Sequence, residues 1–267
     1  MNKRYLGAAI LSPLIVVLFL GGIYLKILIA ILSLIGMYEF YSVSKQKGIN
    51  PISTISYVLS IFYYYILIIN ETIDFHKIFL IIILALFIMM CIPVLWEKYN
   101  FIDVSVTLLG FFYVTIFFSF IVLVNNKQDG NYLIWTIFIS AWLCDTCAYY
   151  TGKFFGKNKL CPRVSPKKTI EGSIGGLLGS ALFCGLYGFI INKIGVNIQI
   201  YNFFIIGIFA GVVCQFGDLV ASSIKRYVGV KDYSDLIPGH GGILDRFDSI
   251  LFTSVIVYYY VTIAMKL

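Results

Sequence analysis

Residues 78–95 read IFLIIILALFIMMCIPVL, a run of apolar side chains with no charged residue. A helix needs about 20 such residues to cross the hydrocarbon core of a bilayer. Comparable runs recur along the chain, and we predict nine transmembrane helices, at 6–22, 24–43, 52–69, 78–95, 104–124, 132–151, 173–191, 203–221 and 249–265. The sequence therefore predicts an all-α, polytopic integral membrane protein.

The composition of the 267-residue chain leads to the same class, because 60% of its residues are hydrophobic and only 12% are charged. An average soluble domain carries about 25% charged residues. So large an apolar excess cannot be buried in one soluble core, which excludes an ordinary soluble enzyme, a disordered chain and a disulfide scaffold. The formal net charge of +7 would favour nucleic-acid binding in a soluble protein. In a membrane protein it is typical of the positive-inside bias, so we expect no nucleic acid as a partner.

The positions of the basic residues predict the orientation of the helices. If the N-terminus lies in the cytoplasm, 15 of the 20 Lys and Arg residues fall on the cytoplasmic side. The other five fall outside, at Lys26, Lys77, Lys127, Lys193 and Lys266. Because cytoplasmic loops carry an excess of Lys and Arg, this bias predicts a cytoplasmic N-terminus and a C-terminus outside.

Two cytoplasmic loops, 152–172 and 222–248, are longer than the others and carry ten of the 20 basic residues. The other loops are too short to form a domain. We therefore divide the chain into residues 1–130, with the first five helices, and residues 131–267, a catalytic transmembrane region that contains both loops. We expect any chemistry to be built from these loops and the helix ends beside them.

The first loop contains Ser165-Pro166-Lys167-Lys168-Thr169. The proline favours an extended backbone, which projects Lys167 and Lys168 near the membrane surface. Two adjacent lysines with hydroxyl neighbours suit phosphate oxygens. A polybasic loop that touches anionic lipid head groups explains the same residues equally well.

The second loop is more specific, because it places carboxylates and cations together. Asp245 and Asp248 are spaced to share one helix face, and Asp218 lies at the cytoplasmic end of the preceding helix. Carboxylates that meet at a membrane face repel one another unless a cation lies between them, and oxygen-only ligands favour Mg²⁺. Four basic residues are available to neutralise a polyphosphate: Lys225, Arg226, Lys231 and Arg246.

Glycines in the same loop would let a ligand approach the backbone closely. Gly241 and Gly242 follow His240 within the segment Pro238–Gly242. Carboxylates, cations and glycines in this combination are typical of metal-assisted phosphoryl or nucleotidyl transfer. A set of interfacial salt bridges around a tight turn is the alternative interpretation.

These motifs resemble those of the phosphatidate cytidylyltransferase, or CDP-diacylglycerol synthase, family. The resemblance covers about residues 145–249 and rests on ordered segments, which are Asp145-Thr146-Cys147-Ala148-Tyr149, Ser165-Pro166-Lys167-Lys168-Thr169-Ile170-Glu171-Gly172, Ser223-Ile224-Lys225-Arg226, Lys231-Asp232, Pro238-Gly239-His240-Gly241-Gly242 and Asp245-Arg246-Phe247-Asp248. One departure is Ala221, where many relatives have an acid, so a carboxylate role is not available at that position.

The resemblance implies Mg²⁺-dependent transfer of CMP from CTP to phosphatidate, which releases pyrophosphate and forms CDP-diacylglycerol for phospholipid biosynthesis. It also implies a multi-pass protein of the cell (inner) membrane, a polar cavity that opens to the cytoplasm, and a homodimer. Whether a second cation accompanies Mg²⁺ is left open.

The resemblance and the residue chemistry together suggest roles for the site residues. Asp218, Asp245 and Asp248 are expected to hold the metal, with Asp145 as a further candidate. The residues expected to contact phosphate groups of CTP or phosphatidate are Lys167, Lys168, Ser222, Ser223, Lys225, Arg226, Lys231, Gly241, Gly242 and Arg246. His240 is a candidate both for fixing the loop and for donating a proton.

Two other functions stay open at this point. An enzyme that transfers CMP from CTP to another lipid phosphate, such as an isoprenoid ether lipid, would carry the same motifs, because acyl-binding helices have no readable code. A transporter would place ionisable residues at mid-depth in several helices. The mid-span positions here are nearly free of charge, which disfavours the transporter.

Smaller expectations concern single helices. Cys144 and Cys147 have no second Cys-x-x-Cys partner, so we expect buried thiols rather than a zinc site. Gly175 and Gly179 have the spacing of a close helix contact. We expect Glu39, near the end of the second helix, to lie at the membrane interface.

Overall fold

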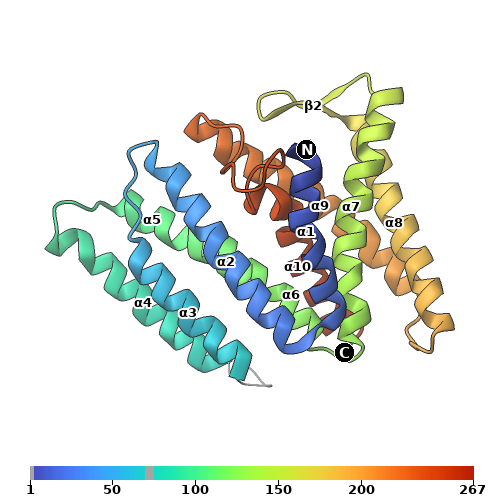
Figure 1. Cartoon of the computed structure of the whole chain (residues 1–267), viewed down its shortest axis with the longest axis horizontal. Helices are drawn as coiled ribbons and strands as arrows, with labels where there is room; N and C mark the ends of the chain where they lie inside the picture. Colours follow the sequence, from blue (N-terminus) through green and yellow to red (C-terminus); the bar gives the residue numbers. More distant parts are fainter. Residues whose placement is uncertain (1–2, 70–74) are drawn as a thin grey trace. The chain divides into compact units, whose positions relative to one another are not determined.

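The computed structural model describes the backbone of residues 3–69 and 75–267 and the side chains of residues 12–69 and 78–267. Helices make up most of it (Figure 1). The elements are α1 (Lys3–Leu20), α2 (Gly22–Lys45), α3 (Ser53–Ile69), α4 (Phe75–Leu95), α5 (Phe101–Gly110), the π-helix η1 (Phe111–Ile116), α6 (Phe117–Asn125), α7 (Gly130–Phe155), β1 (Lys159–Cys161), β2 (Ser165–Thr169), α8 (Ile170–Lys193), α9 (Ile200–Val228), α10 (Leu244–Tyr259) and the π-helix η2 (Tyr260–Ala264). The side chains of Lys3, Arg4 and Lys77, which entered the orientation count, lie outside the described residues.

The predicted class, an all-α protein with several membrane-spanning helices, is confirmed. Each predicted stretch overlaps a helical segment. Within the described residues, seven helical segments are long and apolar enough to cross a membrane. The helix α3 is apolar but has 17 residues. The count of nine crossings and the orientation of the two termini stay predictions.

The helices beside the two long loops extend further than their apolar runs predict. The backbone between α9 and α10 spans only 229–243, and the backbone between α7 and α8 spans only 156–169. The shorter connection contains the antiparallel pair β1 and β2. Hydropathy marks only the part of a helix that contacts hydrocarbon, whereas the backbone hydrogen bonds continue past that boundary.

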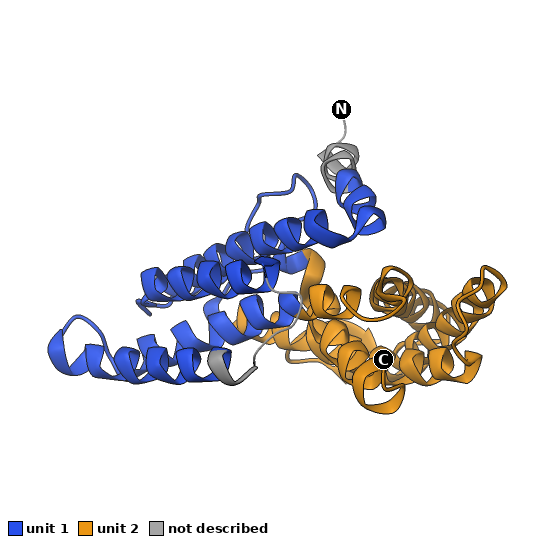
Figure 2. Cartoon of the chain, turned by 90° about the horizontal axis from the view of Figure 1, so that it is seen from below, with its two compact units in different colours: residues 1–119, 228–245 blue, residues 120–227, 246–267 orange. Residues whose placement is uncertain are grey.

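The chain divides into two compact units (Figure 2). The first comprises residues 1–119 and 228–245, and the second comprises residues 120–227 and 246–267. The segment 228–245 therefore belongs with the N-terminal helices, although it is distant from them in sequence. The division at residues 130 and 131 stays a prediction.

Buried hydroxyl groups join the helices of the first unit. The Tyr41 hydroxyl donates to the Thr107 carbonyl oxygen at 2.7 Å, and the hydroxyls of Ser60 and Thr115 lie 2.7 Å apart. The Tyr64 hydroxyl donates to the carbonyl oxygen of Thr115, in η1, at 3.0 Å. Apolar packing drives helix association weakly in lipid, so interhelical hydrogen bonds of this kind help to select the partners.

Glycines bring α7 and α8 of the second unit close together, as their spacing predicts. A Cβ atom at Gly179 would lie 2.6 Å from the Cβ of Cys147, and one at Gly175 would lie 2.5 Å from the Cβ of Thr151. Neither position has room for a larger residue. The predicted close contact at Gly175 and Gly179 is confirmed, and it fixes the helix pair that carries the β1–β2 hairpin.

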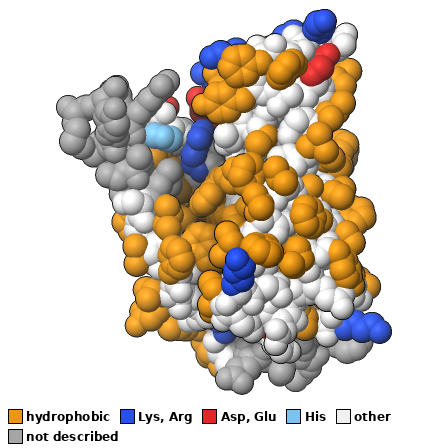
Figure 3. Space-filling view, turned by 90° about the vertical axis from the view of Figure 1, so that its right-hand side faces the viewer, with side chains coloured by type: hydrophobic (Ala, Val, Ile, Leu, Met, Phe, Trp, Pro, Cys, Tyr) orange, Lys and Arg blue, Asp and Glu red, His pale blue; other side chains and the backbone are white. Residues whose placement is uncertain are grey.

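Other positions of α8 are apolar and exposed. Leu178, Leu182 and Leu186 expose 60%, 51% and 47% of their surface. Figure 3 shows hydrophobic side chains over most of one face of the molecule. Small residues inside and large apolar residues outside are the arrangement expected of a helix bundle in lipid.

Replacing Gly179 by valine should separate α7 from α8. We expect Gly179→Val to lower the free energy of unfolding by about 1–3 kcal/mol, the usual cost of overpacking. The neighbouring change Leu178→Val, on the exposed face, should stay within about 0.5 kcal/mol of the unmodified protein. Thermal unfolding of both variants in the same detergent measures the difference, and equal melting temperatures would contradict the close contact.

Candidate active site

The β1–β2 hairpin positions the two lysines of the first loop. Thr169 ends β2, and its hydroxyl accepts a hydrogen bond from the Gly172 backbone N–H at 3.1 Å, which caps α8. The Glu171 carboxylate accepts from the backbone N–H groups of Lys157 and Asn158. The base of the hairpin is therefore tied to the first turn of α8. Lys167 and Lys168 lie next to this base on β2, directly before Thr169.

A cavity of about 370 Å³ lies within the second unit, between the hairpin and the ends of three helices. Its lining residues are Asp145, Ala148, Tyr149, Gly152, Lys153, Leu160, Lys167, Lys168, Thr169, Gly172, Ser173, Gln215 and Asp218. The cavity thus contains cationic and anionic side chains side by side. A cavity of this kind suits a ligand that carries several negative charges and binds together with a cation.

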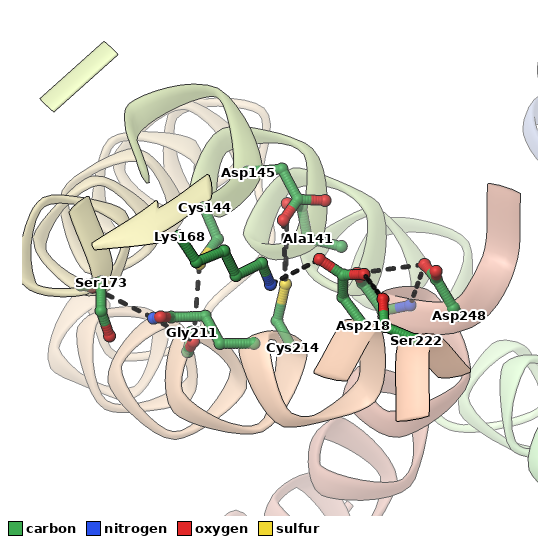
Figure 4. A network of polar contacts seen from close by, with 12 residues as sticks. Ala141, Cys144, Asp145, Lys168, Ser173, Gly211, Cys214, Asp218, Ser222 and Asp248 are labelled. Carbon is green, nitrogen blue, oxygen red and sulfur yellow. Dashed lines mark hydrogen bonds and ion pairs between the residues drawn. The ribbon is translucent and has the colours of Figure 1, made fainter. Parts of the chain in front are cut away.

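An ion pair connects the hairpin to α9. The Lys168 ammonium nitrogen lies 2.5 Å from Oδ2 of Asp218. The other carboxylate oxygen of Asp218 accepts a hydrogen bond from the Ser222 hydroxyl at 3.2 Å, one helical turn further along α9. Figure 4 shows Asp145, Lys168 and Asp218 pointing toward one another from α7, β2 and α9. Lys168 is therefore the cation that already lies among these carboxylates.

Asp248 completes a group of three carboxylates in the second unit. It lies within electrostatic range of both Asp145 and Asp218. Its Oδ1 accepts from the backbone N–H of Ser249 at 2.7 Å and from the Ser249 hydroxyl at 3.3 Å. Lys225, which is only 7% exposed, lies within electrostatic range of Asp248. The geometry thus collects negative charge from α7, α9 and α10, with Lys168 beside Asp218 and Lys225 near Asp248.

Asp245 has a different environment, in the first unit. Its Oδ2 accepts from the backbone N–H of Tyr233 at 2.7 Å and from that of Gly242 at 2.9 Å. Gly241 has a φ of 80°, and a Cβ there would lie 2.9 Å from the same oxygen. The Nδ1 of His240 lies 3.4 Å from the Pro238 carbonyl oxygen. In this loop the Asp245 carboxylate holds the backbone in place.

The predicted site residues therefore fall into two groups. The second unit brings together Asp145, Lys168, Asp218, Ser222, Lys225 and Asp248, and Lys167 lines the same cavity. Arg246 lies within electrostatic range of Asp145, whereas Ser223 and Arg226 are on the exposed side of α9. The residues of the first unit are Lys231, His240, Gly241, Gly242 and Asp245.

Several lining residues escaped the sequence analysis. The Gln215 side-chain amide donates to the carbonyl oxygens of Ser173 and Gly211, both at 3.1 Å, and it lines the cavity. A polar residue one turn before Asp218 in an apolar helix was the signal that could have identified it. Tyr149 and Lys153 follow Asp145 on the same helix, at four and eight residues, which places them on its cavity face.

The donor set suits a hard cation that is shared with a ligand. In the part of the chain that the structure describes, no group of three or more His, Cys, Asp or Glu side chains is placed so that it could hold a metal ion by itself. Magnesium usually keeps several waters and takes one or two protein carboxylates together with substrate phosphates. Asp145, Asp218 and Asp248 offer oxygen ligands only, which is the donor type that Mg²⁺ takes.

The ion pair between Lys168 and Asp218 should be measurable as a coupling free energy. We expect Lys168→Met and Asp218→Asn to be non-additive, with an interaction of about 1 kcal/mol, since the two side chains are only partly exposed. The measurement is a double-mutant cycle by unfolding in detergent. Lys159→Met, on the other strand of the hairpin, is the matched control and should be additive with Asp218→Asn. Additivity in both cycles would show that the ion pair does not form.

Comparison with known proteins identifies the family of the chain. The Cytidylyltransferase family matches residues 2–264. A protein of Staphylococcus aureus (strain COL) named phosphatidate cytidylyltransferase is 34% identical over 255 residues, which are 94% of this chain and 95% of that protein. Proteins of the same name from Staphylococcus haemolyticus and Staphylococcus saprophyticus are 41% and 42% identical over 156 and 158 residues, and each alignment spans 58% of this chain and 58% of the relative. The match to the family over nearly the whole chain, together with the full-length relative, shows that the chain belongs to the cytidylyltransferase family.

Proposed function

We propose that this protein transfers CMP from CTP to phosphatidate, releasing pyrophosphate and forming CDP-diacylglycerol. Family membership and the names of the relatives support the reaction. The single structural observation that carries the proposal is the cavity of the second unit, where Lys153, Lys167 and Lys168 lie beside Asp145 and Asp218. A membrane-embedded helix bundle with such a polar cavity suits a reaction between a soluble nucleotide and a lipid.

The reaction joins two anions, and this requirement explains the lysines. A phosphate oxygen of phosphatidate attacks the α-phosphorus of CTP and forms a new P–O bond. The bond from the α-phosphorus to the bridging oxygen breaks, and pyrophosphate leaves with the electron pair. Cationic side chains reduce the repulsion between the reactants and stabilise the charge that develops on the leaving group. A phosphate monoester is nucleophilic near pH 7, so the mechanism requires no general base.

We assign Lys168 to the phosphate groups of the substrates. Its ammonium pairs with Asp218, and a phosphate oxygen could replace that carboxylate as its partner. Lys167 and Lys153 line the same cavity and contribute positive charge. Lys225 is assigned to the phosphates from the side of Asp248.

We assign the Mg²⁺ to Asp145, Asp218 and Asp248. When bound, Mg²⁺ supplies positive charge to the phosphate oxygens of the nucleotide. The ligand set expected from the sequence contained Asp245 and kept Asp145 as a further candidate. The hydrogen bonds that Asp245 accepts from Tyr233 and Gly242 favour a loop-holding role for it.

The active site is proposed to face the cytoplasm at the cell (inner) membrane. The concentration of Lys and Arg in residues 152–172 and 222–248 supports this orientation. A cytoplasmic site is also consistent with CTP, which is a soluble substrate. A homodimer and a second cation stay predictions from the family resemblance.

The substrate assignment predicts a nucleotide-selective lipid product. Purified protein incubated with phosphatidate, Mg²⁺ and each of the four labelled nucleoside triphosphates should form a labelled lipid and pyrophosphate with CTP only. A parallel series with an isoprenoid ether lipid phosphate tests the alternative acceptor. Absence of a CTP-dependent lipid product across several detergents would contradict the proposed reaction.

The carboxylate assignment predicts large losses of activity at matched positions. Asp218→Asn and Asp248→Asn should each lower kcat by about 100-fold or more, because charge stabilisation in the transition state is lost. Asp129→Asn, just before α7, is the same chemical change at the opposite end of that helix from Asp145 and should leave kcat unchanged. The Mg²⁺ dependence of each variant is measured alongside. Near-normal activity of Asp218→Asn and Asp248→Asn would show that these residues do not hold the metal.

A further inference from the structure

Glu39 is a carboxylate near the C-terminal end of a membrane-spanning helix, and the proposed chemistry does not use it. It lies on α2 and is only 1% exposed. The sequence suggested a residue at the membrane interface and contained no signal for a fully buried one. A buried carboxylate at such a place is costly unless other groups satisfy it.

Three donors from a distant segment satisfy the Glu39 carboxylate. Its Oε1 accepts from the Ser234 hydroxyl at 2.6 Å and from the Ile243 backbone N–H at 2.9 Å. Its Oε2 accepts from the Leu244 backbone N–H at 2.9 Å. These donors lie at both ends of the segment 234–244, so one side chain holds the segment closed. All of these residues belong to the first unit.

The same segment is shaped around the carboxylate. A Cβ at Gly242 would lie 2.5 Å from Oε1 of Glu39, so a larger residue there would displace the carboxylate. Gly242 in turn donates its backbone N–H to Asp245. Two carboxylates, Glu39 from α2 and Asp245 from α10, thus hold the backbone of residues 242–244.

We propose that Glu39 is a positioning residue for cytidylyl transfer, an inference that rests on the proposed function. It holds the segment 234–244 and the first turn of α10. The carboxylate also lies at the N-terminal end of α10, where negative charge is favourable. The same helix carries Arg246, two residues after Leu244, and Asp248, one turn after it.

The charge and both oxygens of Glu39 are needed for this role. A glutamine at this position keeps one acceptor oxygen but turns an NH₂ group toward the backbone N–H of either Leu244 or Ile243. Two donors then face each other, and one buried N–H loses its partner. An alanine removes all three interactions, whereas Ser234→Ala removes one of them.

The test compares Glu39→Gln, Glu39→Ala and Ser234→Ala in the full-length purified protein with CTP, phosphatidate and Mg²⁺. We expect kcat per folded protein to fall about 10-fold, 100-fold and 2-fold, respectively, while the KM for phosphatidate changes less than about twofold. Amide hydrogen exchange at residues 240–244 should accelerate at least about 10-fold in Glu39→Gln, with α8 unchanged. Glu97→Gln, the same chemical change at an exposed residue, is the matched control and should behave as the unmodified protein.

Two results would overturn the inference. One is an unchanged kcat per folded protein in Glu39→Gln, even with a lowered yield or melting temperature, since that describes a purely structural role. The other is unchanged hydrogen exchange at residues 240–244. If Glu39→Ala does not fold, Glu39→Gln and Ser234→Ala still test the inference by kcat and by hydrogen exchange. If the unmodified protein forms no CTP-dependent lipid, the proposed function fails, and the exchange measurement still tests whether Glu39 holds the segment.

Discussion

A carboxylate on a membrane helix must find donors or cations within the protein, because hydrocarbon provides neither. Several such residues accept hydrogen bonds from backbone N–H groups outside their own helix. Asp103 accepts from two backbone N–H groups, Glu39 from two and from a serine hydroxyl, and Asp245 from two. Asp218 differs, since both of its oxygens are satisfied by side chains, one of which is the ammonium of Lys168.

This difference separates residues that hold the fold from residues suited to bind a ligand. A backbone N–H cannot move without deforming its segment, so the carboxylate that accepts from it acts as a fixed support. A lysine side chain can exchange one anionic partner for another by rotating about its own bonds. The hairpin combines both properties, because Thr169 and Glu171 fix its base while the Lys168 ammonium stays free to change partner.

The sequence predicted the helices well because a long apolar run has few other structures in lipid. It also predicted the close contact at Gly175 and Gly179, since their spacing is a local property of one helix. The extension of α7 and α9 into the aqueous connections and the β1–β2 hairpin could not be predicted, because hydropathy does not report on backbone structure outside the membrane. The hydrogen-bond partners of Glu39 could not be predicted either, since they follow it by about 200 residues in the chain.

The residues of the candidate site could be named from the sequence, but the role of each one could not. Asp245 and Asp248 share a helix at a spacing that predicts a common face. Asp245, however, lies in the first turn and accepts from the backbone N–H of Gly242, three residues before it. Asp248 instead lies within electrostatic range of Asp145 and Asp218. A carboxylate in the first turn of a helix can accept from backbone N–H groups that have no partner within the helix. A carboxylate one turn later has no such group within reach. A motif does not encode where its residues lie relative to the start of the helix. This position explains why Asp245 supports the loop, whereas Asp248 is the one proposed to bind a cation.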